Sequence, residues 1–173
     1  TLIDMAKERG WKDDGKRHYL TPEELAARQR KRQEDDQRAQ ADIAKEQAQA
    51  AAWADAIIKA GTHATVETPY LKRKDLQPVG ELYEIDVQQA ARILGYTPKF
   101  KGEPLQGRLL VVPIQRNGKV CSLELIDGDK RKHSLPGRET KTGGYWATTS
   151  PLPENVADIV IPEGCADTLT VKA

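Results

Sequence analysis

The sequence has few aromatic residues and no long apolar run. Aromatic side chains make up 5% of its 173 residues and hydrophobic residues 38%, while charged residues reach 31%. The hydrophobic share lies below the roughly 45–50% that is usual for globular domains. We therefore expect one compact domain with a small, mainly aliphatic core, together with an extended appendage.

An excess of one charge sign is also missing, because 27 basic residues face 26 acidic ones. This balance excludes a histone-like electrostatic sponge but allows local basic patches. The two cysteines, Cys121 and Cys165, form no CxxC pair. A zinc site would need both of them with two of His18, His63 and His133, at spacings that match no known finger. We therefore expect no structural zinc.

No apolar run approaches the ~18 residues that a membrane span requires, and no signal-peptide hydrophobic region opens the chain. Unpaired cysteines without an export signal favour the cytoplasm. The chain begins at Thr1 rather than at a methionine, which suggests a fragment. The sequence therefore predicts a cytoplasmic protein segment that does not contact a membrane.

A long charged helix is predicted over residues 21–61, after a short helical piece and a polar linker in residues 1–20. Thr21, Pro22 and Glu24 form a capping-box pattern, and no glycine or proline follows before Gly61, which is well placed to end the helix. Such a helix is ~58 Å long at 1.5 Å per residue.

The two halves of this helix differ in polarity. Residues 28–36 are polar on every side, and we favour a solvated spacer over a nucleic-acid contact for this run. The second half carries a thin apolar stripe that is too rich in alanine for a robust coiled coil. Its members are Ile43, Ala50, Trp53, Ala54 and Ile57. We expect the C-terminal end to dock on the domain while the N-terminal half extends into solvent.

The clearest β signal is a hairpin. Residues 109–115 and 119–126 flank an Arg-Asn-Gly turn, and the second strand alternates so that one face is buried more consistently. Residues 86–94 form a small predicted helix capped by Asp86 and ended by Gly95. A third strand is possible from Lys130. Residues 159–161 resemble a short buried strand, followed by a turn at Glu163 and a helix over residues 166–172.

An ordered series of segments resembles one known family. The segments are residues 70–76, 107–114, 118–128, 130–135 and 159–167, the last of which reads Ile-Val-Ile-Pro-Glu-Gly-Cys-Ala-Asp. Over residues 66–173 the chain resembles toprim-type DNA primases of phages, plasmids and integrative elements. It is similar to the N-terminal part of the bacterial primase RNA-polymerase domain up to the first toprim motif. Two positions depart from the family pattern, since Asp75 replaces a usual glycine and Cys165 a usual aromatic.

The resemblance implies an α+β fold. A long N-terminal helix is followed by a small domain with an antiparallel hairpin or sheet and short helices over residues 62–157. Residues 158–173 would be the first strand and helix of a toprim α/β fold. The sequence ends before the second acidic cluster that toprim catalysis needs, so we expect the fragment to be inactive alone.

The function implied for the parent protein is RNA primer synthesis for DNA replication of a mobile element, a nucleotidyltransferase reaction. The expected partners are single-stranded DNA, nucleotides and a replicative helicase in the same or another chain. Magnesium is expected in the full-length parent and no cofactor in this fragment. An alternative function is a non-catalytic interaction or linker module whose long helix mediates partner binding or self-association.

Glu163 is the residue that the resemblance assigns to catalysis. It would act as a general base or hold Mg²⁺, with Asp167 as a possible second ligand. The alternative is that Glu163 only caps the following helix and that Asp167 is a helix-surface carboxylate. Cys165 has no partnering histidine in the sequence, so we interpret it as a small buried residue.

Template binding is predicted for seven basic residues. They are Arg108, Lys130, Arg131, Lys132, Lys72, Arg73 and Lys74. If these cations converge, they would follow the phosphates of a single strand. The alternative for residues 130–132 is a solvated turn, partly neutralised by the preceding aspartates. Tyr145 and Trp146 could stack on bases, although core packing is favoured where aromatic residues are so few.

Overall fold

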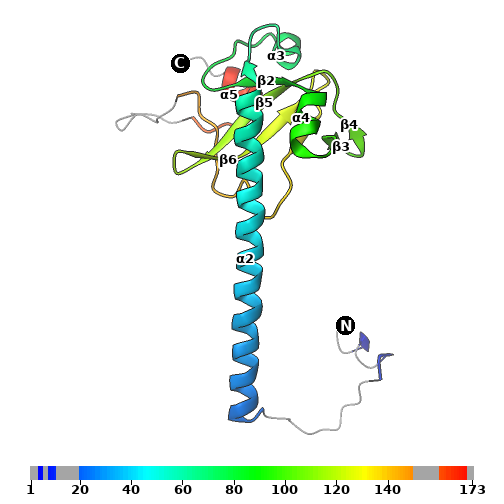
Figure 1. The fold of residues 1–173 in the computed structure, drawn as a ribbon, viewed down its shortest axis with the longest axis vertical. Coiled ribbons are helices and arrows are strands. Elements are labelled where there is room, and N and C mark those ends of the chain that lie inside the picture. Colours follow the sequence, from blue (N-terminus) through cyan, green and yellow to red (C-terminus); the bar gives the residue numbers. More distant parts are fainter. Residues whose placement is uncertain (1–3, 6–7, 11–19, 150–159, 171–173) are drawn as a thin grey trace. The chain divides into compact units, whose positions relative to one another are not determined.

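The structure, a computed structural model, describes residues 4–5, 8–10, 20–149 and 160–170 (Figure 1). It is mixed α+β, with a long N-terminal helix and an antiparallel sheet. The described elements are α2 (Pro22–Ala60), β1 (Thr62–His63), α3 (Pro69–Lys74), β2 (Tyr83–Asp86), α4 (Val87–Leu94), β3 (Lys99–Phe100), β4 (Glu103–Pro104), β5 (Arg108–Arg116), β6 (Lys119–Ile126), β7 (Lys132–Ser134) and α5 (Cys165–Thr170). No helix in the described ranges is both long and apolar enough to cross a membrane.

The chain divides into two compact units, Thr1–Gln40 and Ala41–Ala173. In the first unit the predicted capping box is confirmed. The Thr21 amide donates to Glu24 Oε2 at 2.8 Å, and the Glu24 amide donates to Thr21 Oγ1 at 3.2 Å. Side chains from 21 to 40 are exposed except for the half-buried Ala26. Asp4, Met5 and Glu8 are helical and Gly10 has φ +87°, whereas the predicted linker over residues 12–17 lies outside the described residues.

The second unit is built on a five-stranded sheet in the order β1-β2-β5-β6-β7, with every pair antiparallel. The predicted hairpin is confirmed as β5 and β6. Its turn residues Asn117 and Gly118 both have positive φ, 52° and 71°, as a two-residue type I′ turn requires. The pairing register shifts between Ile114 and Gln115, which leaves Cys121 as the extra residue of a bulge. The possible third strand is also present, as β7.

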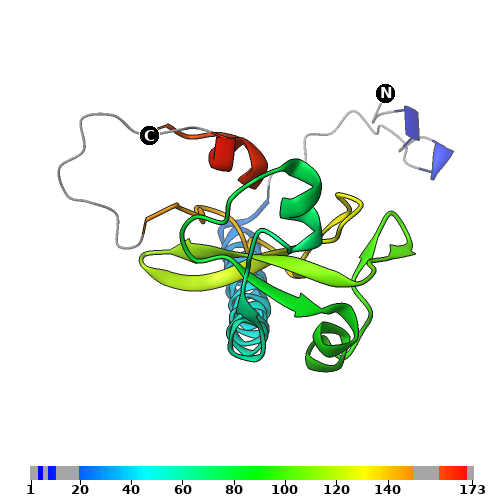
Figure 2. The same cartoon turned by 90° about the horizontal axis from the view of Figure 1, so that it is seen from above.

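Both faces of this sheet carry buried core residues. Figure 2 shows the C-terminal part of α2, from residue 41 on, and α4 on one side of the sheet and α3 with α5 on the other. Leu109, Val111, Leu123 and Leu125 belong to the core on the α2 and α4 side. Leu110, Val112 and Ile126 belong to the core on the α3 and α5 side. Within β6 the predicted difference between the faces is confirmed, since Leu123 and Leu125 are fully buried while Glu124 on the opposite face is only half-buried.

The C-terminal part of α2 docks on the sheet as predicted, with Ala50, Ala54 and Ile57 fully buried. Gly61 ends the helix, but its role differs from the one predicted. It is absent from the residues with positive φ, and a Cβ there would lie 2.9 Å from the Glu84 carbonyl oxygen. The glycine is therefore needed because β2 passes close to its backbone. At α4 the predicted cap is confirmed, since Asp86 accepts from the Gln88 amide at 2.8 Å.

The predicted strand over residues 159–161 does not form in its described part. Val160 and Ile161 lie outside any strand and are 64% and 86% exposed, while residue 159 is not among the described residues. An apolar run becomes a strand only when a neighbouring strand satisfies its backbone groups, and no described strand pairs with this segment. The following helix does form, as α5, and begins at Cys165.

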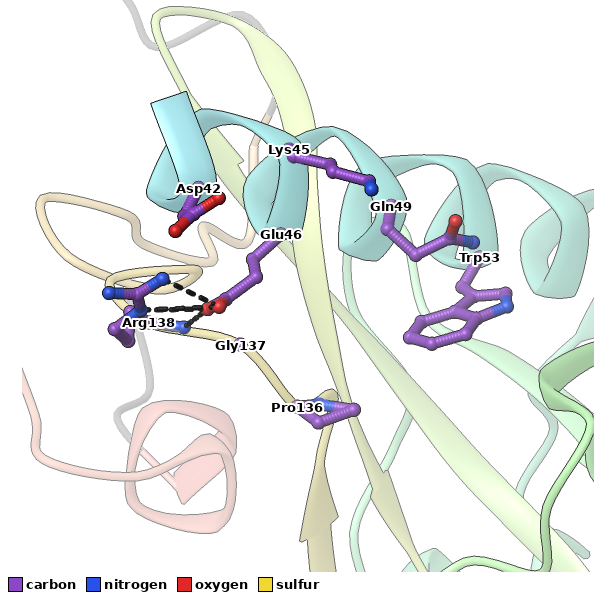
Figure 3. Close-up of a pocket in the computed structure, with 8 residues that line it drawn as sticks. All are labelled: Asp42, Lys45, Glu46, Gln49, Trp53, Pro136, Gly137 and Arg138. Carbon is purple, nitrogen blue, oxygen red and sulfur yellow. Dashed lines mark hydrogen bonds and ion pairs between the residues drawn. The ribbon is translucent and has the colours of Figure 1, made fainter. Parts of the chain in front are cut away.

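A clamp joins α2 to the loop after β7 (Figure 3). The Glu46 carboxylate accepts from the Arg138 backbone amide at 2.6 Å and from Arg138 Nη2 at 2.9 Å. Gly137 allows this approach, because a Cβ there would lie 3.2 Å from Glu46 Cβ. Glu46 and Arg138 also line a groove of about 770 Å³ between α2 and this loop, and Trp53 and Pro136 are among its other lining residues.

The clamp is expected to make stability depend on pH. The Arg138 side chain, and then its backbone amide, hold the pKa of Glu46 below its ordinary value of 4.5. A group whose pKa is lowered by folding stabilises the protein above its unfolded pKa, and this contribution is lost as pH falls through the folded pKa. The difference in Tm between the wild type and Glu46→Gln should therefore be largest at neutral pH and shrink below about pH 4.5. Thermal unfolding of both proteins from pH 7 to pH 3 measures this. A difference that stays constant over that range would contradict it.

Candidate nucleic-acid interface

Helix α3 presents the first predicted basic cluster. Pro69 occupies its first turn, and Tyr70 and Leu71 bury one face against the sheet, which leaves the side chains of residues 72–74 exposed. The helix ends at Asp75, which has φ 54° and ψ 46° and donates its amide to the Leu71 and Lys72 carbonyls. A left-handed backbone suits glycine best and aspartate better than most residues. The turn therefore forms with aspartate at this position.

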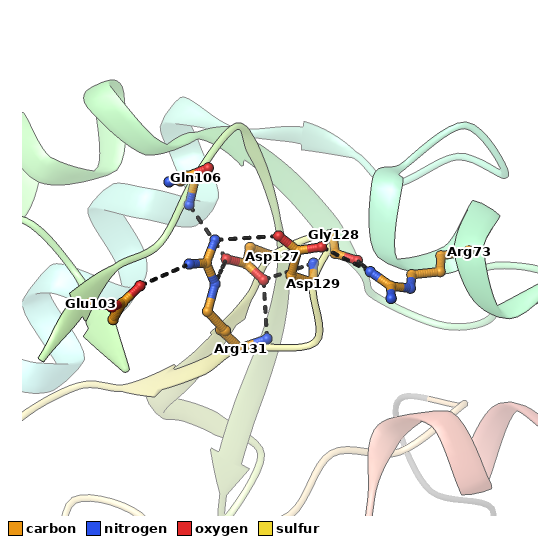
Figure 4. Close-up of polar contacts among 7 residues, drawn as sticks. All are labelled: Arg73, Glu103, Gln106, Asp127, Gly128, Asp129 and Arg131. Carbon is orange, nitrogen blue, oxygen red and sulfur yellow. Dashed lines mark hydrogen bonds and ion pairs between the residues drawn. The ribbon is translucent and has the colours of Figure 1, made fainter. Parts of the chain in front are cut away.

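The turn between β6 and β7 brings the second cluster to α3 (Figure 4). Arg73 Nη1 donates to the Gly128 carbonyl at 3.0 Å and to Asp129 Oδ1 at 2.8 Å. A Cβ on Gly128 would lie 3.1 Å from Pro69 Cβ, so the turn packs closely against the start of α3. Residues 72–74 and 130–132 therefore belong to adjoining elements, as their predicted common role requires.

Asp127 organises this turn. Its carboxylate is 1% exposed and accepts from the Asp129 amide at 2.9 Å, the Arg131 amide at 3.0 Å and Arg131 Nε at 2.7 Å. The Gln106 amide adds a longer contact at 3.4 Å. The Arg131 side chain is itself only 19% exposed. These contacts favour a structural role for Arg131, and DNA binding by this residue stays a prediction.

Arg108 and Lys132 lie on the α3 and α5 side of the sheet. Leu110, Val112 and Ile126 belong to the core on that side. Arg108 points to the same side because it alternates with Leu110 and Val112 along β5, and Lys132 does so because it pairs with Ile126 across β6 and β7. The charge of Lys132 also affects the Cys165 thiol in α5. Burial raises the pKa of the Cys165 thiol to about 12, and the nearby Lys132 opposes that rise. The interpretation of Cys165 as a small buried residue is confirmed.

The cations on this side differ in their pairing. Lys72 pairs with Glu67 at 2.6 Å, and Arg108 pairs with Glu84. The side chains of Lys74, Lys130 and Lys132 form no hydrogen bond or ion pair with any residue that the structure describes. We call Lys72, Lys74, Arg108, Lys130 and Lys132 the basic surface. Its neighbours include the acids Glu67, Glu84, Asp127 and Asp129, which limit the local excess of positive charge.

Glu163 is exposed and lies two residues before the start of α5, and the exposed Asp167 lies in the first turn of that helix. Within the described ranges, no three His, Cys, Asp or Glu residues group in a way that could hold a metal ion. Magnesium in proteins takes several oxygen ligands in near-octahedral geometry. The described residues around Glu163 therefore do not fit a magnesium site by themselves.

Of the two aromatic candidates for base stacking, Trp146 is half-buried against the core and donates its indole N–H to the Glu81 carbonyl at 3.3 Å. Tyr145 is 42% exposed, and its backbone forms an isolated antiparallel β-bridge with Gln115. The favoured interpretation as core is thus confirmed for Trp146 and wrong for Tyr145, whose side chain is exposed and belongs to neither core cluster.

Sequence reasoning missed Glu84, the largely buried acid that pairs with Arg108. It also missed the hydrogen bonds of Lys141, which donates to Glu124 Oε1 at 2.7 Å and to Ser134 Oγ at 2.8 Å. The only signal for such pairs would have been an acidic residue at a strand position that the alternation buries. No protein-family model, curated protein sequence or solved structure matches this chain.

Proposed function

We propose that this chain is the template-guiding part of a toprim-type DNA primase, which makes RNA primers for the replication of a mobile element. The basic surface binds single-stranded DNA through its phosphates. The parent enzyme supplies nucleotide binding, Mg²⁺ and the further acidic residues, and works with a replicative helicase. In that setting Glu163 is the first acidic residue of the catalytic site, with Asp167 as its supporting carboxylate.

The observation that carries the proposal is the meeting of two distant basic clusters on one side of the sheet. Arg73 joins α3 to the turn that bears Lys130, and Lys132 faces α5. The same side thus carries the cations and the helix that follows Glu163. A strand held there would lie near the segment that the resemblance assigns to catalysis.

The acids within this surface predict weak, salt-sensitive binding. Each phosphate neutralised on a single strand contributes a slope of about −0.7 to the dependence of log K on log salt concentration. Three to five contacts would therefore give a slope of about −2 to −3.5. The exposed face of Tyr145 can add base stacking, which tolerates any sequence.

Fluorescence anisotropy of a labelled (dT)20 strand, titrated with the protein over a series of salt concentrations, tests the proposal. We expect saturable binding at low salt with an affinity that falls as salt rises. Absence of binding at low salt, or an affinity that does not respond to salt, would reject it.

A second candidate function rests on α2. Its residues 22–40 form a capped, uninterrupted helix whose side chains are almost all exposed. Such a helix can recruit a partner or a second copy of the chain. Sedimentation of the protein as a dimer that is lost on deletion of residues 21–40 would favour this function.

A further inference from the structure

We infer that Thr68 and Glu84 position Arg108 to bind one backbone phosphate of single-stranded DNA, an inference that rests on the proposed function. Neither Thr68 nor Glu84 is a cation, so neither stood out in the sequence. Their contacts nevertheless separate Arg108 from the other cations of the basic surface.

The anchor of this arrangement is the Glu84 carboxylate, whose side chain is 10% exposed. Both of its oxygens are used. Oε1 accepts from Arg108 Nη2, and Oε2 accepts from the Thr68 hydroxyl at 2.7 Å. Thr68 is fully buried, and its hydroxyl oxygen accepts from the Thr65 amide at 2.9 Å. The carboxylate therefore has little freedom to rotate, and neither does the guanidinium that it holds.

The unequal burial of the two partners points to a ligand. The Arg108 side chain is 55% exposed although its partner is almost completely buried. A guanidinium carries five N–H donors, and here one nitrogen donates to Glu84 while the others form no hydrogen bond with a residue that the structure describes. A planar guanidinium held at one edge offers its remaining donors in a fixed fork, which matches two oxygens of a phosphate.

The surroundings favour a phosphate of the DNA strand as the occupant. Arg108 lies on the same side of the sheet as Lys132, and α3 with its lysines begins directly after Thr68. The other acid beside Arg108 is Asp86, its partner across β2 and β5. The Asp86 carboxylate accepts from the Gln88 amide, so it is engaged at the start of α4.

The test compares a charge-neutral pair of substitutions with the wild type. Glu84→Gln combined with Arg108→Gln keeps the net charge and leaves no buried carboxylate unpaired. We expect (dT)20 to bind about fivefold more weakly at low salt and the salt slope to become shallower by about 0.7, the value for one lost phosphate. A natively folded double variant with unchanged affinity and slope would overturn the inference.

Positioning by Thr68 is tested separately, because a merely structural threonine would affect stability but not affinity. Thr68→Val removes the hydroxyl and is expected to weaken (dT)20 binding about threefold in the folded protein, while Thr68→Ser restores it. Equal affinities for the valine and serine variants would overturn the role of Thr68.

If the wild type binds no DNA, the proposed function and this inference fail together. The other case is that the wild type binds DNA and the Lys130 and Lys132 substitutions weaken binding, but Glu84→Gln with Arg108→Gln does not. The proposed function then stands and only this inference fails.

Discussion

Replacement of Asp127 by alanine is expected to lower the free energy of unfolding by about 3 kcal/mol, the scale found when one partner of a buried ion pair is removed. The carboxylate is almost completely buried and organises the turn between β6 and β7 through two backbone amides and Arg131 Nε. Without it, the Arg131 guanidinium stays largely buried with only Glu103 and Asp129 at 4.0 and 3.6 Å.

Urea unfolding of the purified protein measures this change. Asp129→Asn is the matched control, because Asp129 lies in the same turn but is 66% exposed. Exposed ion pairs contribute about 0–1 kcal/mol, so the control should change stability little. Equal effects of the two substitutions would show that Asp127 does not organise the turn.

Reversal of two charges on the basic surface is expected to reduce single-stranded DNA affinity at least about tenfold at low salt. Lys130→Glu with Lys132→Glu removes two cations that form no hydrogen bond or ion pair with the described residues, and it adds two repelling carboxylates. Both changes act on the phosphate interaction that dominates such binding. Arg131 is left in place because its replacement would disturb the turn.

The control carries the same change of net charge elsewhere. Lys101→Glu with Lys119→Glu alters two exposed lysines, one after β3 and one at the start of β6 beside the hairpin turn. Anisotropy with (dT)20 should separate the two double variants by at least about fivefold. Similar losses for both would mean that only the total charge matters and that the basic surface has no special role.

The sequence predicted those features that depend on a few neighbouring residues. The capping box at Thr21, the Asn-Gly turn at residue 117 and the cap at Asp86 each form within four residues of chain, and all three are confirmed. The apolar segment at residues 160–161 depends on a distant partner strand, and there the prediction failed.

For the candidate site, the sequence supplied the cations but not their pairing. Glu84 and Arg108 are 24 residues apart, and Glu46 and Arg138 are 92 apart. Such pairs depend on the packing of whole elements and leave no local pattern. The sequence therefore could not distinguish Arg131, which is held in the turn, from Lys132, which forms no hydrogen bond or ion pair within the described part of the chain. The proposed roles of both remain predictions.

The outer strands of the sheet have a consequence for self-association. The central strands β5 and β6 have nine and eight residues, whereas the outer strands β1 and β7 have two and three. A long bare outer strand presents unpaired backbone groups to which a strand of another molecule can add. Here the long strands β5 and β6 lie inside the sheet, and its edges are the short strands β1 and β7. The exposed Lys132 also places a charge on β7. The sheet thereby resists the edge-to-edge growth that begins aggregation.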